Sequence, residues 1–459
     1  MISKEQLQTI LKSATRTGAD FAEIFLESTE KRVMQSLSGE IYGVSTSEVA
    51  GAGIRIIKDL DEMYGYTNIV TFDSLNELAL ELSKSFAGKP TKVLEFNDEK
   101  PYNVILKRPM REVPNSEKAQ IIRKYSKIIK DYDERIVQAG VNLVEWEQKI
   151  LVVNNKGIYQ SDYRPYIRIS FMAVAQSEKG MQDSFEAPGA QKGFEFIDEI
   201  DGESIAKEVA ESAIRILNAD EIKPEKMTVV LNNGFGGVIF HEACGHPLEA
   251  SSVSKGLSPF TGKLGEKIAS DVVTAYDDGT LQQAWGHLNF DDEGTPTKKN
   301  LLIENGILKG YLVDYRNGKR MNMESSGSSR RQSYKYSPTS RMNTTYIAPG
   351  KSKFEDLIKN TEYGLFAKKL GGGSVQPATG EFNFQVMEGY YIRNGKIAEP
   401  VKGAMLIGYG AEVLKNIDMV ADNIQLGQGM CGASSGSIPT DVGQPAIRVL
   451  NMTVGGGGQ

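Results

Sequence analysis

A short polar segment near the middle of the chain divides the sequence into two parts of different character. It runs from Asn218 to Pro224 and is followed by an apolar stretch at residues 227–231. Polar segments that end in proline are typical of boundaries between domains. The chain has 459 residues, which is more than one hydrophobic core usually supports. We therefore predict two domains, residues 1–222 and residues 223–459.

The first part contains several segments with the periodicity of amphipathic helices. They lie at residues 3–18, 74–88, 204–217 and directly after Pro114. Ser74 and Glu77 have the spacing of a capping box, so we expect the second of these helices to begin at Ser74. Their apolar stripes are typical of helices that cover a core.

Strand patterns alternate with these helices. They occupy about residues 21–66 and 141–174, with a turn expected at Asn154–Gly157. Gly51 and Gly53 lie inside the first region, and glycine inside a strand favours a bulge or a bend. The first part is therefore predicted to be an α/β domain with a curved antiparallel sheet.

The second part is rich in strand and turn signals. Asn305–Gly306 and Asn394–Gly395 each lie between apolar residues, which is the strongest short-range signal for a hairpin. Glycine-rich or serine-rich stretches at 325–331, 371–374 and 455–458 are expected to be loops. We predict a β-rich domain, which makes the whole chain an α+β protein.

The composition is that of a globular protein and argues against some classes of partner. Hydrophobic residues make up 40% and charged residues 24% of the chain, without an apolar run of about 18 residues that could span a membrane. A net charge of −6 gives no electrostatic reason to expect nucleic acid as a direct partner. The first residues lack the apolar centre of a secretory signal, so a cytoplasmic location is expected.

Two of the three histidines lie in one motif, His241-Glu242-Ala243-Cys244-Gly245-His246-Pro247. The familiar zinc-peptidase helix separates its two histidines by four residues, which places them on one face. The separation here is five, which corresponds to about 140° on a regular helix. Gly245 permits unusual backbone angles, and Pro247 disfavours the α conformation at His246. We therefore expect a broken helix, in which either His246 leaves the helix or one wide π-like turn realigns the side chains.

Glu242 and one further ligand would complete a catalytic zinc site. Glu242 is the candidate general base, because a carboxylate next to a ligand histidine lies beside the open coordination position. A catalytic zinc also needs a third protein ligand. Cys431, which has glycines nearby, suits zinc together with two imidazoles. Cys244 competes with Cys431 for this role, and Glu249 and His287 are weaker candidates.

Each of these residues also has a simpler interpretation. The two histidines can be a coincidental polar cluster, Cys431 a buried inert thiol and His287 a hydrogen-bonded structural residue. Arg330, Arg331 and Arg341 could hold a peptide carboxylate or backbone carbonyls, although a solvated loop is the simpler interpretation. Arg330 and Arg331 are our candidates for substrate binding.

Several segments together resemble the TldD branch of the TldD/PmbA metallopeptidases, a family once labelled modulators of DNA gyrase. The resemblance covers essentially the whole chain and is most specific from about residue 230 onward. It is carried by His241–Glu249, Phe290–Pro296, Arg330–Tyr334, Arg341–Thr344, Gly380–Phe384 and Gly429–Gly432.

The resemblance implies a zinc ion bound by His241, His246 and Cys431, with Glu242 as the catalytic carboxylate and Cys244 outside the ligand set. It implies an N-terminal α/β domain, a C-terminal β-rich domain and a dimer, formed with a second copy or with a PmbA-type paralogue. The substrates implied are unfolded polypeptides, taken in as an extended strand inside a closed chamber.

The sequence therefore favours a zinc-dependent peptidase that cleaves unfolded or extended polypeptides. A non-catalytic regulator of a gyrase or a toxin–antitoxin system is the alternative, and it would need no intact metal site. A cysteine peptidase that uses Cys431 with a histidine is weaker, because the sequence around this cysteine shows no signature beyond small residues.

Overall fold

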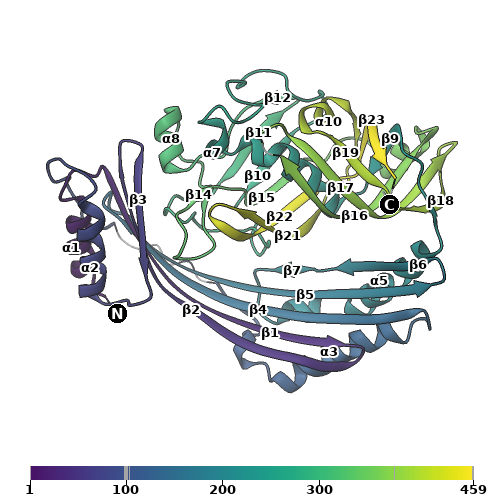
Figure 1. The fold of residues 1–459 in the computed structure, drawn as a ribbon, viewed down its shortest axis with the longest axis horizontal. Helices are drawn as coiled ribbons and strands as arrows, with labels where there is room; N and C mark the ends of the chain where they lie inside the picture. Colours follow the sequence, from purple (N-terminus) through teal and green to yellow (C-terminus); the bar gives the residue numbers. More distant parts are fainter. Residues whose placement is uncertain (1, 98–101, 103, 377, 457–459) are drawn as a thin grey trace.

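The computed structural model describes residues 2–97, 102, 104–376 and 378–456. The N-terminal part is built around long strands that curve together (Figure 1). Its elements are α1 (Lys4–Thr15), β1 (Phe21–Leu37), β2 (Glu40–Lys58), β3 (Asp61–Thr67), α2 (Phe72–Ser83), a 3-10 turn (Met110–Glu112), α3 (Asn115–Lys130), β4 (Ile136–Asn154), β5 (Tyr159–Ser177), β6 (Gly180–Glu186), β7 (Gly189–Ala190), α4 (Glu195–Glu199) and α5 (Gly202–Leu217).

These strands form one antiparallel sheet in the order β3-β2-β1-β4-β5-β6. Side chains alternate between the two faces of a strand, so Val141 and Val153 of β4 lie on the same face. Val141 packs in the core beneath α3 and α5, and Val153 packs in the core beneath α1 and α2. Ile150 and Val152 point to the opposite face, where they contact Phe290 and Tyr334 of the C-terminal part. The sheet therefore carries helices on one face and the second domain on the other.

Two predictions in this domain are wrong in detail. Helix α2 begins after Thr71, not at Ser74, because Thr71 has an extended backbone and its hydroxyl accepts the Ser74 N–H at 3.3 Å. Of the bulge or bend expected at Gly51 and Gly53, the bulge is absent, since the register of β1 and β2 is continuous through both positions. A Cβ at Gly51 would lie 2.4 Å from the ring of Tyr334. The missing side chains thus let the second domain approach the sheet.

The C-terminal part contains two larger sheets and the segment that carries the histidines. Its elements are β8 (Asp220–Glu221), β9 (Glu225–Leu231), a 3-10 turn (Gly234–Gly237), α6 (Val238–Phe240), a π-helical turn (His241–Gly245), a 3-10 turn (His246–Leu248), α7 (Ala250–Val253), β10 (Ala275–Asp278), β11 (Lys299–Glu304), β12 (Ile307–Leu308), α8 (Tyr315–Met321), β13 (Ser329–Arg330), β14 (Thr339–Ser340), β15 (Thr344–Ile347), α9 (Phe354–Lys359), β16 (Tyr363–Gln376), β17 (Glu381–Arg393), β18 (Lys396–Lys402), β19 (Met405–Tyr409), α10 (Gly410–Asn416), β20 (Ile417–Val420), β21 (Gln425–Ala433), β22 (Gly436–Gln444) and β23 (Ile447–Gly455).

One sheet closes on itself. Its path β16-β9-β23-β19-β17 returns to β16 through a direct pairing of β16 with β17. The other sheet has the order β12-β11-β10-β15-β22-β21, which leaves β21 at an edge among the described residues. The predicted curved antiparallel sheet, the β-rich second domain and the α+β class are confirmed. The division between residues 222 and 223 stays a prediction, and it falls between β8 and β9.

The expected hairpins are present, but one expected loop is not. Asn305–Gly306 joins β11 to β12 and Asn394–Gly395 joins β17 to β18, with positive φ at all four residues. Residues 371–374 lie inside β16, so their assignment to a loop is wrong. The pairing of β16 with β17 shifts register between Leu370 and Gly373, which lets a glycine-rich strand follow an irregular path. Of the expected loop at 455–458, the last two residues lie outside the described part.

Candidate metal centre

The histidine motif contains one turn of π-helix. The His246 N–H donates to the carbonyl of His241, five residues earlier, and the chain continues in a 3-10 turn from His246 to Leu248. A wider turn absorbs the extra residue between the histidines and brings both side chains to one side. The predicted break in the helix is therefore confirmed, and it takes the form of the wide turn.

Pro247 does not force His246 out of the helical conformation, contrary to our expectation. His246 has φ −59° and ψ −43°, which are helical values. Pro247 lies in the first turn of the 3-10 segment, where its missing N–H is not needed. Gly245 allows the wide turn by leaving room for a neighbouring side chain, not by adopting unusual backbone angles, because a Cβ there would lie 2.1 Å from Sδ of Met342.

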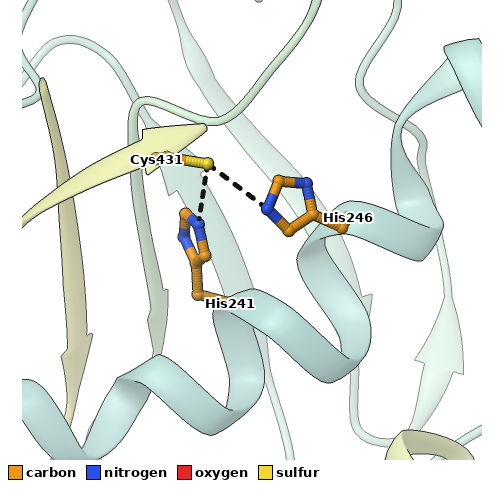
Figure 2. A group of neighbouring side chains, drawn as sticks. All are labelled: His241, His246 and Cys431. Atoms are coloured by element: carbon orange, nitrogen blue, oxygen red, sulfur yellow. Dashed lines mark hydrogen bonds between the residues drawn. The ribbon is translucent and has the colours of Figure 1, made fainter. Parts of the chain in front are cut away.

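Three potential metal ligands converge at this turn (Figure 2). Cys431 lies on β21, and its Sγ is 3.2 Å from Nε2 of His241 and 3.3 Å from Nε2 of His246. All three residues are buried. With Zn–S near 2.3 Å and Zn–N near 2.0–2.1 Å, tetrahedral angles give an S to N separation of about 3.5 Å. The side chains therefore fit a zinc ion in both donor type and spacing.

The electrostatics of the cluster favour an ionised sulfur. Burial opposes ionisation of Cys431, but the imidazoles of His241 and His246 outweigh it and hold the pKa of the thiol well below its ordinary value. Burial likewise opposes a charge on His246, yet Glu249 and Cys431 raise the pKa of its imidazole well above the usual range. A thiolate with two imidazoles is a donor set that suits zinc.

Neighbouring residues orient the cluster. Oε1 of Glu249 lies 3.1 Å from Nδ1 of His246, so Glu249 fixes the ring instead of competing for the metal. The guanidinium of Arg341 donates to the carbonyl of Cys431 and lies 3.9 Å from Glu249. Nδ1 of His241 is buried without a hydrogen-bond partner in the described part of the chain.

Side chains from other parts of the chain donate hydrogen bonds to the backbone carbonyls of strand β21. Nε1 of Trp285 donates to the carbonyl of Gly429 at 2.8 Å, and Arg168 of β5 donates to the carbonyl of Gln428 at 2.9 Å. The ring of Trp285 contacts the rings of Trp146 and Tyr166 on the curved sheet. Sequence reasoning missed these two donors, because each acts on a strand more than a hundred residues away.

Glu242 is the accessible member of the group. Its side chain is 26% exposed, and Oε2 lies 3.5 Å from Nε2 of His246. It lines a cavity of about 200 Å³ together with His241, Cys431, Gly371–Gly373 and Phe384. A carboxylate beside the three converging donors can exchange protons with a molecule in that cavity.

The remaining candidates lie elsewhere. Cys244 is buried among apolar residues, and burial raises the pKa of its thiol. His287 is a structural residue, since its Nδ1 is 2.7 Å from the carbonyl of Gly279. Arg330 and Arg331 are 2% and 3% exposed, so the solvated-loop interpretation is wrong for both. Arg331 is ion-paired with Glu23 of β1. Both arginines line a cleft between the curved sheet and the β21–β22 hairpin.

Models of one family match most of the chain. The PmbA/TldA metallopeptidase domain 1, central domain and C-terminal domain match residues 22–85, 108–217 and 224–456. The chain belongs to the PmbA/TldD metallopeptidase family. It is accordingly a metallopeptidase, and the resemblance noted in the sequence is confirmed.

Individual relatives agree with this family membership. Proteins named metalloprotease TldD homolog from Buchnera aphidicola (Schizaphis graminum strain) and Haemophilus influenzae are each 33% identical, over 99% of this chain and 96% and 97% of their own length. A zinc metalloprotease TldD homolog from Saccharolobus solfataricus is 25% identical over 97% of this chain and 99% of its own length.

Two solved structures have the same fold. A putative modulator of a DNA gyrase from Thermotoga maritima aligns with TM-score 0.81 at 21% identity, over 98% of this chain and 99% of that one. TldE from Thermococcus kodakarensis aligns with TM-score 0.77 at 21% identity, over 98% and 100%. Among the described residues, no helix has the length and apolar character that a membrane span requires.

Proposed function

We propose that the chain is a zinc-dependent peptidase of unfolded or extended polypeptides, with His241, His246 and Cys431 as ligands and Glu242 as the catalytic carboxylate. The observation that carries the proposal is the convergence of Nε2, Nε2 and Sγ beside a partly exposed carboxylate. The donors come from segments 190 residues apart. A coincidental polar cluster would not bring a buried thiol to both imidazoles.

The residues of this chain would divide the reaction between them. Zinc in such a site supplies a Lewis acid that polarises the scissile carbonyl and makes water a better nucleophile at neutral pH. Glu242 would accept the proton from the attacking water and deliver it to the leaving amine. Glu249 keeps the ring of His246 in place.

The shape of the site supports an extended substrate. The cavity at Glu242 adjoins one of about 630 Å³, and Phe235, Gly371, Gly372, Gly429 and Met430 line both. Strand β16 pairs with β9 only over residues 364–367, so no strand among the described residues pairs with residues 369–376 along that edge, and Gly371 and Gly372 of this stretch line the larger cavity. Hydrogen bonds to such edges give a peptide affinity without demanding a particular sequence.

The partner and the location are proposals that rest on the family. We expect a homodimer or a heterodimer with a PmbA-type paralogue, without direct binding to nucleic acid or to a membrane. Zinc thiolate chemistry needs Cys431 reduced, which suits the cytoplasm. Mass photometry of the protein alone and mixed with a paralogue would distinguish the two assemblies.

Two alternatives make different predictions. A non-catalytic regulator is the alternative that the names of some structural relatives support, since these proteins are called putative modulators of DNA gyrase. Such a protein would cleave nothing. A cysteine peptidase based on Cys431 would cleave without metal and would be blocked by thiol alkylation.

The test measures cleavage of one protein substrate, in an unfolded and a folded form, by the protein with and without zinc. The metal-free protein and the zinc-loaded protein are each incubated with a reduced, alkylated substrate and with its folded form. We expect hydrolysis of the unfolded form only, and only with zinc. Hydrolysis without metal would favour the cysteine peptidase, and no hydrolysis by any dimer would favour the regulator.

A further inference from the structure

A second cleft, of about 480 Å³, lies between the curved sheet and the β21–β22 hairpin, which Figure 1 shows above the sheet. Met430 lines this cleft as well as the cavity at Glu242. The two spaces are thus neighbours on either side of the strand that carries Cys431. Its charged lining residues are Lys31, Arg164, Arg330, Arg331, Lys335, Glu27 and Asp292.

The acidic residues of this cleft are already engaged. Asp292 pairs with Arg164 at 2.7 Å and accepts the backbone N–H of Arg331. The oxygens of Glu27 accept hydrogen bonds from Thr29, Gln148 and the backbone of Tyr334. Arg331 is paired with Glu23 of β1, so Lys31, Arg330 and Lys335 are the cations of the cleft that have no carboxylate partner among the described residues.

Arg330 is the cation for which the lack of a carboxylate partner has the largest effect. Its side chain is buried, and its Nη1 donates a hydrogen bond to the carbonyl of Met342 at 2.8 Å. In the part of the chain that the structure describes, it has no carboxylate within ion-pairing distance. A buried guanidinium without a counter-ion is costly. Its planar fork of donors matches a carboxylate.

The surroundings increase the need for an anion. Burial lowers the pKa of Arg330; Tyr166 and Asp292 oppose this in part, whereas the neighbouring Arg164 and Arg341 add to it. Lys31 and Lys335 are exposed on the rim, where each lies over an aromatic ring, of Trp146 and Tyr334 respectively. Positive charge at the rim would draw an anion toward the buried guanidinium.

We propose that Arg330 binds a carboxylate of the peptide substrate and so selects substrates that carry one at a fixed distance from the scissile bond. The inference rests on the proposed peptidase function. The carboxylate can come from an aspartate or glutamate side chain or from the C-terminus of the peptide, and both have the same chemistry at Arg330. Arg330 is thus a specificity-determining residue, separate from the metal ligands.

The test compares matched peptides on the zinc-loaded full chain. One series moves a single glutamate, or glutamine as its neutral control, through the positions of an unstructured peptide. A second series compares a free C-terminus with its amide. We expect kcat/KM to be about tenfold or more higher for the carboxylate at one position. The series in which this occurs identifies the source of the carboxylate.

Variants assign the preference to Arg330. Arg330→Gln should bring the ratio of kcat/KM for acidic and neutral peptides close to one, and Arg330→Lys should retain part of it. Arg393→Gln is the control, because it removes a surface cation paired with Glu399 on a distant hairpin. A preference that survives in folded Arg330→Gln protein would overturn the inference. If this variant does not fold, an unchanged preference in both Arg330→Lys and Lys335→Gln would overturn it.

A binding readout separates this inference from the proposed function. Fluorescence anisotropy of labelled acidic and neutral peptides measures affinity without cleavage. Tighter binding of acidic peptides that is lost in Arg330→Gln, with no cleavage of any peptide, would support the carboxylate subsite and reject the proposed peptidase function. Cleavage and binding without preference for a carboxylate would reject the subsite and leave the peptidase standing.

Discussion

Sγ of Cys431 lies 3.2 Å from Nε2 of His241, although 190 residues separate them in the chain. The contact joins the edge strand β21 to the π-helical turn and forms the centre of the proposed metal site. Neither segment can bind a metal in this way alone. Correct folding of the second domain is therefore a condition for metal binding.

Loss of the thiol should empty the site. We predict that Cys431→Ser lowers the zinc content from about one ion per chain toward zero and lowers the melting temperature, because a ligand that binds the folded state stabilises it. Cys244→Ala is the matched control, since Cys244 lies among apolar residues and should leave the metal content unchanged. Elemental analysis and thermal unfolding measure both effects. Full zinc content in Cys431→Ser would remove this residue from the ligand set.

The side chains that donate hydrogen bonds to the backbone of β21 should affect the affinity of the site for zinc. Trp285→Phe removes the hydrogen bond to the carbonyl of Gly429, and we expect zinc affinity to fall by about tenfold. Trp146→Phe is the control, because Trp146 belongs to the same aromatic cluster and, among the described residues, donates no hydrogen bond to β21. Competition with a chromogenic chelator measures the affinities. Equal losses in both variants would indicate a general packing defect.

The π-helical turn should depend on the space at Gly245. Gly245→Ala places a Cβ against Sδ of Met342, and we predict a loss of about 1–3 kcal/mol in the free energy of unfolding. Met342→Ala removes the obstacle and creates a cavity that the new methyl group fills in part. Urea unfolding of both single variants and the double variant tests the coupling. Strictly additive effects would show that the two residues do not compete for space.

Acid should weaken the contact between the two domains at Glu388. Burial opposes its ionisation, but hydrogen bonds from Tyr390, Ser212 and Lys368 outweigh burial and lower the pKa to about 2 from 4.5. Ser212 lies on α5 of the first domain, 2.7 Å from the carboxylate of Glu388 on β17. A lowered folded-state pKa gives stability that is present above pH 4.5 and lost as the pH falls toward 2, roughly 2–3 kcal/mol in all.

Substitution of the carboxylate measures this contribution. The free energy of unfolding of Glu388→Gln should fall less steeply between pH 5 and pH 2 than that of the native chain. Glu324→Gln removes an exposed carboxylate and should keep the native slope. Identical slopes in all three proteins would contradict the role of Glu388.

Local signals in the sequence predicted most of the elements but not all of their ends. Asn-Gly pairs and helical stripes are formed by residues that are close together in the sequence, so they predicted the hairpins and the helices. Thr71, not Ser74, caps α2, because both residues have capping chemistry and only the backbone path decides. The glycines at 371–373 serve a strand, since backbone pairing with β17 replaces the side-chain pattern that usually indicates one.

The candidate site shows the same division between local and long-range information. The spacing of His241 and His246 predicted an interrupted helix, and the structure shows how the interruption aligns them. Donor chemistry made Cys431 a candidate ligand beside Cys244, but only the family resemblance selected it, because no local pattern ties it to the histidines. Burial of Arg330 and Arg331 was missed, since it arises from the packing of the second domain against the curved sheet.

The central claim is that Glu242 is catalytic while His241, His246 and Cys431 hold the metal. The most direct test measures zinc content and cleavage of an unfolded peptide by Glu242→Gln protein under the conditions in which the native chain is active. We predict about one zinc per chain and a fall in kcat of about 10²–10⁴. Native activity in a zinc-loaded Glu242→Gln variant would contradict the assignment.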